Sequence, residues 1–216
     1  TLDGLLSPPK DIELERIPSL SDSLDRVTRM QSTPLKLSKD ESRDIVLGFD
    51  IGSTGSKVVA VDLEEAEPLW ESYVNTNGNP VGAAQQLMQS YVDSDASRHR
   101  LKLVGATGSG REVVGSLMST CYGVDRVFVL NEIAAHAEGA AHYDERVDTI
   151  FEIGGQDAKY IRLNDGRVVD AAMNEACSAG TGSFIEEQGR KFSGIKDVVH
   201  LGEVGLRASA GVSLGQ

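Results

Sequence analysis

Phe-Asp-Ile-Gly-Ser-Thr-Gly-Ser-Lys, at residues 49–57, joins an apolar strand to a turn of small residues. The strand directs the carboxylate of Asp50 at the turn, where glycines without a Cβ let backbone N–H groups approach an anion closely. Phe-Glu-Ile-Gly-Gly-Gln-Asp, at residues 151–157, repeats this arrangement later in the chain. Two such turns predict a phosphate-binding cleft between two related halves of the protein.

The first turn differs from a Walker A loop, which has four residues between its glycines before Gly-Lys-Ser/Thr. Here only Ser53 and Thr54 separate Gly52 from Gly55. The pattern instead resembles the phosphate loops of the superfamily that contains actin, the sugar kinases and the heat-shock chaperone ATPases. In that superfamily a hairpin from each half grips the nucleotide phosphates. The resemblance implies an α/β fold of the actin-like ATPase, ribonuclease H-like type.

Composition excludes several classes of protein. With 216 residues, 40% hydrophobic and 5% aromatic, the chain can bury the core of one or two small domains. Its 21 basic and 33 acidic residues give a net charge of −12, which indicates no nucleic-acid partner. The sequence lacks an apolar run of about 18 residues and a signal peptide, so we expect no membrane association and a cytoplasmic location. Two cysteines, Cys121 and Cys177, suit a reducing compartment.

The sequence divides into three parts. Residues 1–44 are rich in proline and charge and predict a linker or arm. Residues 45–146 predict one complete ribonuclease H-like subdomain, and residues 147–216 predict the start of a second that carries a cysteine loop. Because the chain has no initiator Met and ends abruptly, we expect it to be a piece of a longer protein.

Hydrophobic periodicity places the individual elements. A helix opens at Pro80 and carries Val81, Ala84, Met88 and Tyr91 on one face, and Asn131 caps a second helix. After residue 191 only a short segment is expected to be ordered, at 198–201. The predicted strands are 45–51, 58–63, 101–107, 127–130, 149–153, 158–163 and 167–172, with a turn at 164–166 and the second helix at 132–142.

Cys177 lies in a loop of small residues at 174–184. Ser183 and Glu186 have the spacing of a capping box, so the pattern predicts a helix that starts just after the cysteine. Free N–H groups and the helix dipole at this end favour the thiolate, the form that binds metals. The alternative is a small buried side chain without a chemical role.

Five segments together resemble one known family: 50–57, 106–111, 131–139, 152–159 and 174–184. This family comprises the activator proteins of 2-hydroxyacyl-CoA dehydratases and subunits of ATP-dependent benzoyl-CoA reductases. The resemblance covers nearly everything after residue 45. Its most specific part is the loop around Cys177, because sugar kinases share the phosphate turns but have no such cysteine loop.

The resemblance implies a homodimer in which each subunit contributes two cysteines to a bridging 4Fe-4S cluster. ATP binding and hydrolysis change the angle between the subunits, and the cluster passes one low-potential electron to the dehydratase. A ferredoxin or flavodoxin is the implied electron donor. Cys177 becomes one cluster ligand, whereas Cys121 matches none. The second ligand and the adenosine-holding turn are expected beyond Gln216, so this piece is expected to be inactive alone.

The resemblance and the turn chemistry together define the predicted site. Asp50 is the strongest candidate, because a carboxylate facing glycines is costly unless it binds a cation, here Mg²⁺. Asp50, Glu132 and Gln156 form the predicted catalytic set. Lys57 is expected either to contact a phosphate or to be solvated. The predicted nucleotide-binding residues are Gly52, Ser53, Thr54, Ser56, Lys57, Glu152, Gly154, Gly155, Gln156 and Asp157.

Three functions remain open at this point. The first choice is an ATP-dependent activator that transfers a low-potential electron from an iron–sulfur cluster to a 2-hydroxyacyl-CoA dehydratase-type partner. The second is a small-molecule kinase of the N-acetylglucosamine kinase type, which uses the same turns. The third is a non-catalytic, actin-like scaffold domain.

Overall fold

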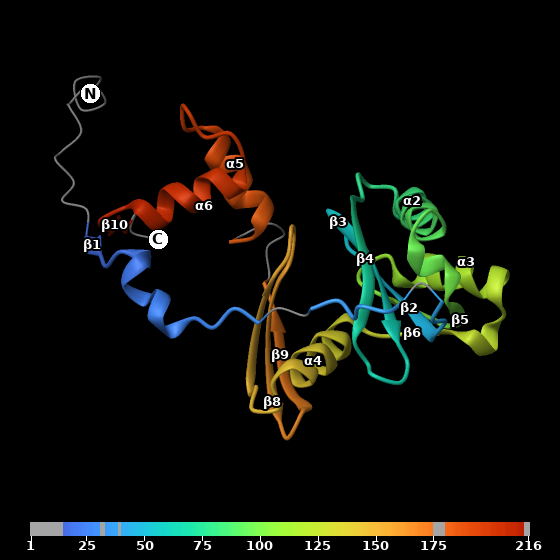
Figure 1. Cartoon of the computed structure of the whole chain (residues 1–216). Helices are drawn as coiled ribbons and strands as arrows, with labels where there is room; N and C mark the ends of the chain where they lie inside the picture. The colour runs from blue at the N-terminus through green and yellow to red at the C-terminus, as the bar shows by residue number, and fades with distance from the viewer. Residues whose placement is uncertain (1–14, 31–32, 39, 175–179, 214–216) are drawn as a thin grey trace. The chain divides into compact units, whose positions relative to one another are not determined.

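The computed structural model describes residues 15–30, 33–38, 40–174 and 180–213 (Figure 1). The chain forms two compact units. The larger unit is Met30–Ile185, and the smaller combines Thr1–Arg29 with Glu186–Gln216. Among the described residues, no helix is both long and apolar enough to span a membrane. The three-part division expected from the sequence stays a prediction.

A five-stranded mixed sheet forms the first half of the larger unit, in the order β4-β3-β2-β5-β6. The first three strands are antiparallel neighbours, whereas β5 and β6 run parallel to β2. Parallel neighbouring strands need a crossover connection, which usually contains a helix that packs against the sheet. The strands are β2 (Asp44–Ile51), β3 (Gly55–Asp62), β4 (Pro68–Asn75), β5 (Arg100–Thr107) and β6 (Val127–Val129).

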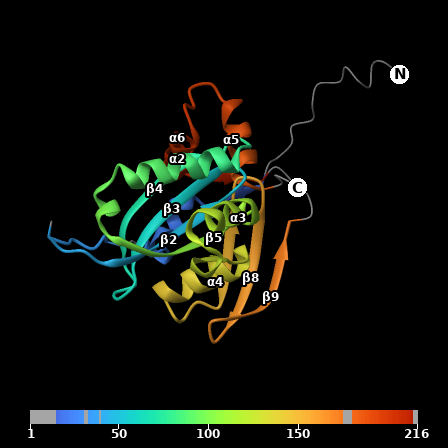
Figure 2. The ribbon, with the colours of Figure 1, turned by 90° about the vertical axis from the view of Figure 1, so that its right-hand side faces the viewer.

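Two helices, α2 (Pro80–Val92) and α3 (Arg111–Tyr122), pack on one face of this sheet (Figure 2). Alternate residues of β2 face them, and all four are buried: Ile45, Leu47, Phe49 and Ile51. The predicted start of α2 at Pro80 is confirmed. Its predicted apolar face is only half right, because the buried residues are Ala83, Ala84, Leu87 and Tyr91. Short 3-10 turns occur at Asp95–Arg98 and Val124–Arg126.

The second half of the larger unit is a three-stranded antiparallel sheet, β7-β8-β9. Its strands are β7 (Thr149–Ile153), β8 (Ala158–Asn164) and β9 (Arg167–Met173), close to the predicted ranges. Asp165 and Gly166 both have positive φ, as a tight hairpin turn requires. Helix α4 (Glu132–Tyr143) packs on this sheet through Ala137 against Ile161 and Leu163.

The smaller unit pairs β1 (Arg16–Ile17) with β10 (Gly211–Val212), and the 3-10 helix η1 (Leu20–Arg26) contacts α6 (Val198–Arg207). The ordered segment predicted at 198–201 is therefore longer than expected. Asp197 explains its start, because its carboxylate accepts a hydrogen bond from the backbone N–H of His200.

Helix α5 (Gly182–Arg190) begins earlier than its sequence pattern suggests. The capping position predicted at Ser183 is wrong, because Ser183 lies inside the first turn of the helix. The physical reason is that the first N–H groups of α5 have other acceptors. The N–H of Gly182 donates to the carbonyl of Gly154 (2.9 Å) and that of Ser183 to Gly155 (3.0 Å).

Candidate functional site

The two glycine-rich turns predicted from the sequence meet in the larger unit. Residues 52–54 join β2 to β3, and residues 154–157 join β7 to β8. A cavity of about 120 Å³ lies beside them. Its lining residues are Asp50, Gly52, Ser53, Thr54, Gly55, Lys57, Ser109, Glu132, His136, Glu152, Gly154, Gly155, Gln156, Asp157 and Lys159.

Hydrogen bonds beneath the first turn hold its shape. The N–H of Gly52 donates to the carbonyl of Gly55 (3.1 Å), and the hydroxyl of Thr76 donates to the carbonyl of Gly52 (2.7 Å). Ser56 is fully buried and lies 2.7 Å from the Thr76 hydroxyl oxygen. Since the Thr76 proton is already used, Ser56 is the donor in this pair. Ser56 therefore supports the turn from below and does not line the cavity.

Asp50 stands at the edge of the cavity, opposite Lys57 on the neighbouring strand. The Lys57 ammonium lies 3.2 Å from the Asp50 carboxylate, and both side chains are partly exposed. Gly108 makes room for Asp50, because a Cβ at this residue would lie 2.7 Å from the Asp50 carboxylate. Gly108 also has φ of +84°, which disfavours any other residue. A phosphate contact by Lys57 stays a prediction.

Lys159 is the main site residue that the sequence did not reveal. Its ammonium lies 2.9 Å from the Glu152 carboxylate and 3.2 Å from that of Glu132. Burial on its own would lower the pKa of Lys159, but hydrogen bonds to Glu152 and Glu132 outweigh it and raise that pKa. Strand alternation in the sequence could have indicated its burial, because Lys159, Ile161 and Leu163 are every second residue and share the buried face of β8.

A metal ligand set is present in the same place. Glu132, His136 and Glu152 offer ligand atoms that lie within 4.8 Å of one another. The ammonium of Lys159 already bridges the two carboxylates, so we assign no metal to this group.

Ser109 is a second residue of the cavity lining that the sequence analysis missed. Its hydroxyl donates a hydrogen bond to the carbonyl of Ile51 (3.4 Å).

The cavity has a net negative charge. Four carboxylates line it, from Asp50, Glu132, Glu152 and Asp157, against two ammonium groups from Lys57 and Lys159. These six groups together carry a net charge of −2. A polyphosphate would be repelled by such a cavity unless a divalent cation entered with it.

The two flanks of the cysteine loop contact the second turn and the start of β8. Cys177 lies outside the described residues, but both flanks of its loop are described. Before it, the side chain of Asn174 accepts a hydrogen bond from the N–H of Ala158 (2.9 Å). After it, Gly182 donates to Gly154. Cys121 is exposed near the end of α3.

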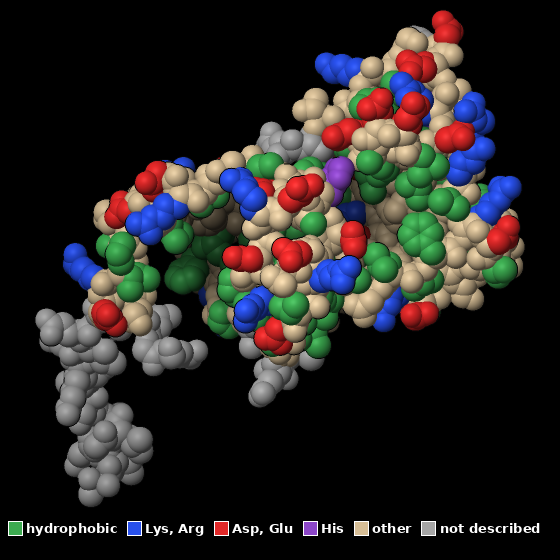
Figure 3. All heavy atoms as spheres, turned by 90° about the horizontal axis from the view of Figure 1, so that it is seen from below, with side chains coloured by type: hydrophobic (Ala, Val, Ile, Leu, Met, Phe, Trp, Pro, Cys, Tyr) green, Lys and Arg blue, Asp and Glu red, His purple; other side chains and the backbone are tan. Residues whose placement is uncertain are grey.

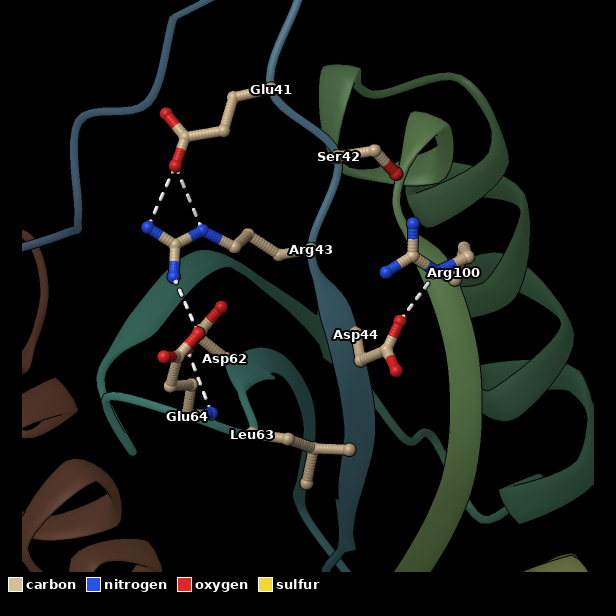
Figure 4. Close-up of a pocket in the computed structure, with 8 residues that line it drawn as sticks. All are labelled: Glu41, Ser42, Arg43, Asp44, Asp62, Leu63, Glu64 and Arg100. Carbon is tan, nitrogen blue, oxygen red and sulfur yellow. Dashed lines mark hydrogen bonds and ion pairs between the residues drawn. The ribbon is translucent and has the colours of Figure 1, made fainter.

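A larger, open cavity of about 520 Å³ lies at the other end of β2 (Figure 4). This cavity also has four carboxylates, from Glu41, Asp44, Asp62 and Glu64, against two guanidinium groups, from Arg43 and Arg100, but no glycine turn lines it. Arg43 contacts Glu41 (2.7 Å) and Glu64 (3.1 Å), and Arg100 contacts Asp44 (2.5 Å). We assign no site there. On the face in Figure 3, acidic and basic side chains of the described residues are mixed, without a large basic patch.

Contact between the two turns gives a testable prediction. A Cβ on Gly155 would lie 2.1 Å from the hydroxyl oxygen and 2.6 Å from the Cβ of Thr54. We expect Gly155→Ala to push the turns apart and to lower the melting temperature by several degrees, since rotating the hydroxyl leaves the Cβ clash in place. Thr54→Gly in the same chain should recover part of the loss. Gly166→Ala is strained by its own φ but touches nothing, so Thr54→Gly should not rescue it.

The fold is that of the actin-like ATPases. The family profile of the BadF/BadG/BcrA/BcrD ATPase family matches residues 47–194. The chain belongs to this family, and the resemblance and the fold class predicted from the sequence are confirmed.

Similar proteins include two that are named as dehydratase activators. The 2-hydroxyisocaproyl-CoA dehydratase activator of Clostridioides difficile is 32% identical over 173 residues, which are 78% of this chain and 59% of the relative. The (R)-2-hydroxyglutaryl-CoA dehydratase activating ATPase of Acidaminococcus fermentans is 29% identical over 140 residues, or 65% of this chain and 50% of the relative. The chain thus spans 50–59% of the length of these relatives.

Solved structures agree with this family. The crystal structure of the Acidaminococcus fermentans dehydratase component A superposes with a TM-score of 0.65 at 28% identity, over 80% of this chain and 62% of that one. The activator of the 2-hydroxyisocaproyl-CoA dehydratase from Clostridium difficile, solved with bound ADPNP, also gives 0.65 at 28% identity, over 80% and 60%.

Proposed function

We propose that this chain is the nucleotide-binding part of an ATP-dependent activator, which transfers one low-potential electron to a 2-hydroxyacyl-CoA dehydratase-type enzyme. The observation that carries the proposal is the meeting of the two glycine turns at a cavity with a net charge of −2. A Mg²⁺ ion would balance this charge and accompany ATP into the site. The names of the relatives supply the partner class.

Each residue has a defined part in this proposal. Asp50 holds the water shell of the cation, and the N–H groups of the turns face the phosphates. Lys57 is released from Asp50 to contact a phosphate oxygen. Glu132 and Gln156 orient the water that attacks the terminal phosphate. Mg²⁺ supplies neutralisation of the charge that develops on the phosphate oxygens.

The electron-transfer half of the proposal rests on the cysteine loop. Four thiolates are the usual ligands of a 4Fe-4S cluster, so a homodimer with Cys177 and one further cysteine per subunit would complete the set. Anchoring of the loop to Gly154 and Ala158 supports the proposal, because nucleotide-driven movement of the turn would reach the loop directly. A cytoplasmic location and a ferredoxin or flavodoxin donor complete the proposed setting.

The test is purification of the full-length protein without oxygen. A brown, dimeric protein that contains iron and hydrolyses Mg-ATP would support the activator. A colourless protein that phosphorylates an amino sugar would replace the proposal with a kinase. Nucleotide-dependent filaments without turnover would replace it with a scaffold.

A further inference from the structure

The Lys159 ammonium occupies the position that a metal ion would take between two carboxylates. The ion pairs join three elements, because Lys159 is on β8, Glu152 on β7 and Glu132 on α4. We propose that Lys159 is a positioning residue, a built-in cation that holds Glu132 and Glu152 in the wall of the phosphate cavity. We call the ion pairs of Lys159 with Glu132 and Glu152 the tether. The effect on catalysis rests on the proposed ATPase function, whereas the tether itself does not.

The side chain is fixed on both sides. Lys159 pairs directly with Glu152 across the β7–β8 ladder, so the register of the sheet sets one contact. Its 7% exposed side chain shares the face of β8 that α4 covers, together with Ile161. This leaves the stem little freedom, and the ammonium can satisfy its hydrogen-bonding needs only at the carboxylates or in the cavity.

Removing this cation leaves like charges close together. The side chains of Glu132 and Glu152 are only 25% and 18% exposed, so water screens them weakly. With ligand atoms within 4.8 Å of each other, the two carboxylates would repel and turn away from the cavity. Glu132 at the first turn of α4 could no longer hold a water at a constant place. The expected defect lies in turnover rather than in nucleotide affinity.

The tether is tested first by stability, in the full-length protein. Lys159→Met keeps an unbranched side chain one atom shorter and removes the charge, and it should lower the melting temperature by about 5 °C. Adding Glu152→Gln should then raise the melting temperature, although Glu152→Gln alone lowers it. The matched control is Lys102→Met, which breaks an exposed ion pair with Asp44 (3.3 Å) outside the cavity and should change little.

Turnover tests the positioning role. We expect Lys159→Met to lower kcat for Mg-ATP about 30-fold while KM changes less than about twofold. Lys159→Arg retains the charge and should recover most of the lost kcat. If the role of Lys159 were purely structural, the double variant Lys159→Met with Glu152→Gln would recover kcat together with its melting temperature. We expect its kcat to stay low.

The two readouts separate the two ideas. Additive effects of Lys159→Met and Glu152→Gln on melting would overturn the tether, whatever the activity. Normal kcat in a folded Lys159→Met protein would overturn the positioning role. Absence of ATP hydrolysis in the wild type would overturn the proposed function, and the melting experiment would still decide the tether.

Discussion

Replacing Asp50 by alanine should reduce ATP hydrolysis by the full-length protein at least about 100-fold. Asp50 is the carboxylate that ends β2 at the glycine turns, and Gly108 leaves space for it at the cavity. Without it the cavity loses its proposed grip on the hydrated Mg²⁺ ion. The fold should remain intact, because Asp50 is partly exposed and its ion pair with Lys57 contributes little. Phosphate release under saturating Mg-ATP measures the effect.

Asp44 provides a matched control on the same strand. Its side chain is 38% exposed, against 37% for Asp50, and it pairs with Lys102 and, as Figure 4 shows, with Arg100. Asp44 faces the other cavity, so Asp44→Ala should retain normal turnover. Equal turnover in both variants would remove the phosphate site from consideration. For the 216-residue chain alone we expect only weak ATP binding by calorimetry, because it spans 50–59% of the length of the relatives described above.

Replacing Cys177 by alanine should abolish the iron–sulfur cluster of the full-length protein made without oxygen. If each subunit of a dimer supplies two thiolates, losing one from each leaves two, too few for a stable 4Fe-4S cluster. The iron content should fall from about four per dimer to near zero. The 216-residue chain by itself should be colourless, because it carries Cys177 but no second candidate ligand.

Cys121 is the control for this experiment. It is the other cysteine of the chain, exposed near the end of α3. Cys121→Ala should retain iron, colour and turnover. A cluster that survives in Cys177→Ala would refute the ligand assignment and favour the kinase. Loss of iron in both variants would point to general instability, which melting curves of the two proteins resolve.

Local chemistry explains how much was predictable from the sequence. Strand alternation, the proline at the start of α2 and the Asn131 cap act within a few residues, and each appears where it was expected. The helix boundary at Ser183 failed for a related reason. Acceptors for the first N–H groups of α5 come from Gly154 and Gly155, which are distant in sequence.

The sequence by itself therefore determined the α/β fold, the two glycine turns and the acidic residue before each of them. Tertiary structure alone decided which groups share the cavity. It buried Ser56 beneath the first turn, set Gly155 against Thr54 and placed the ammonium of Lys159 between Glu132 and Glu152. The reason is physical: backbone patterns follow from neighbouring residues, whereas the partner of a buried charge depends on which distant elements pack together.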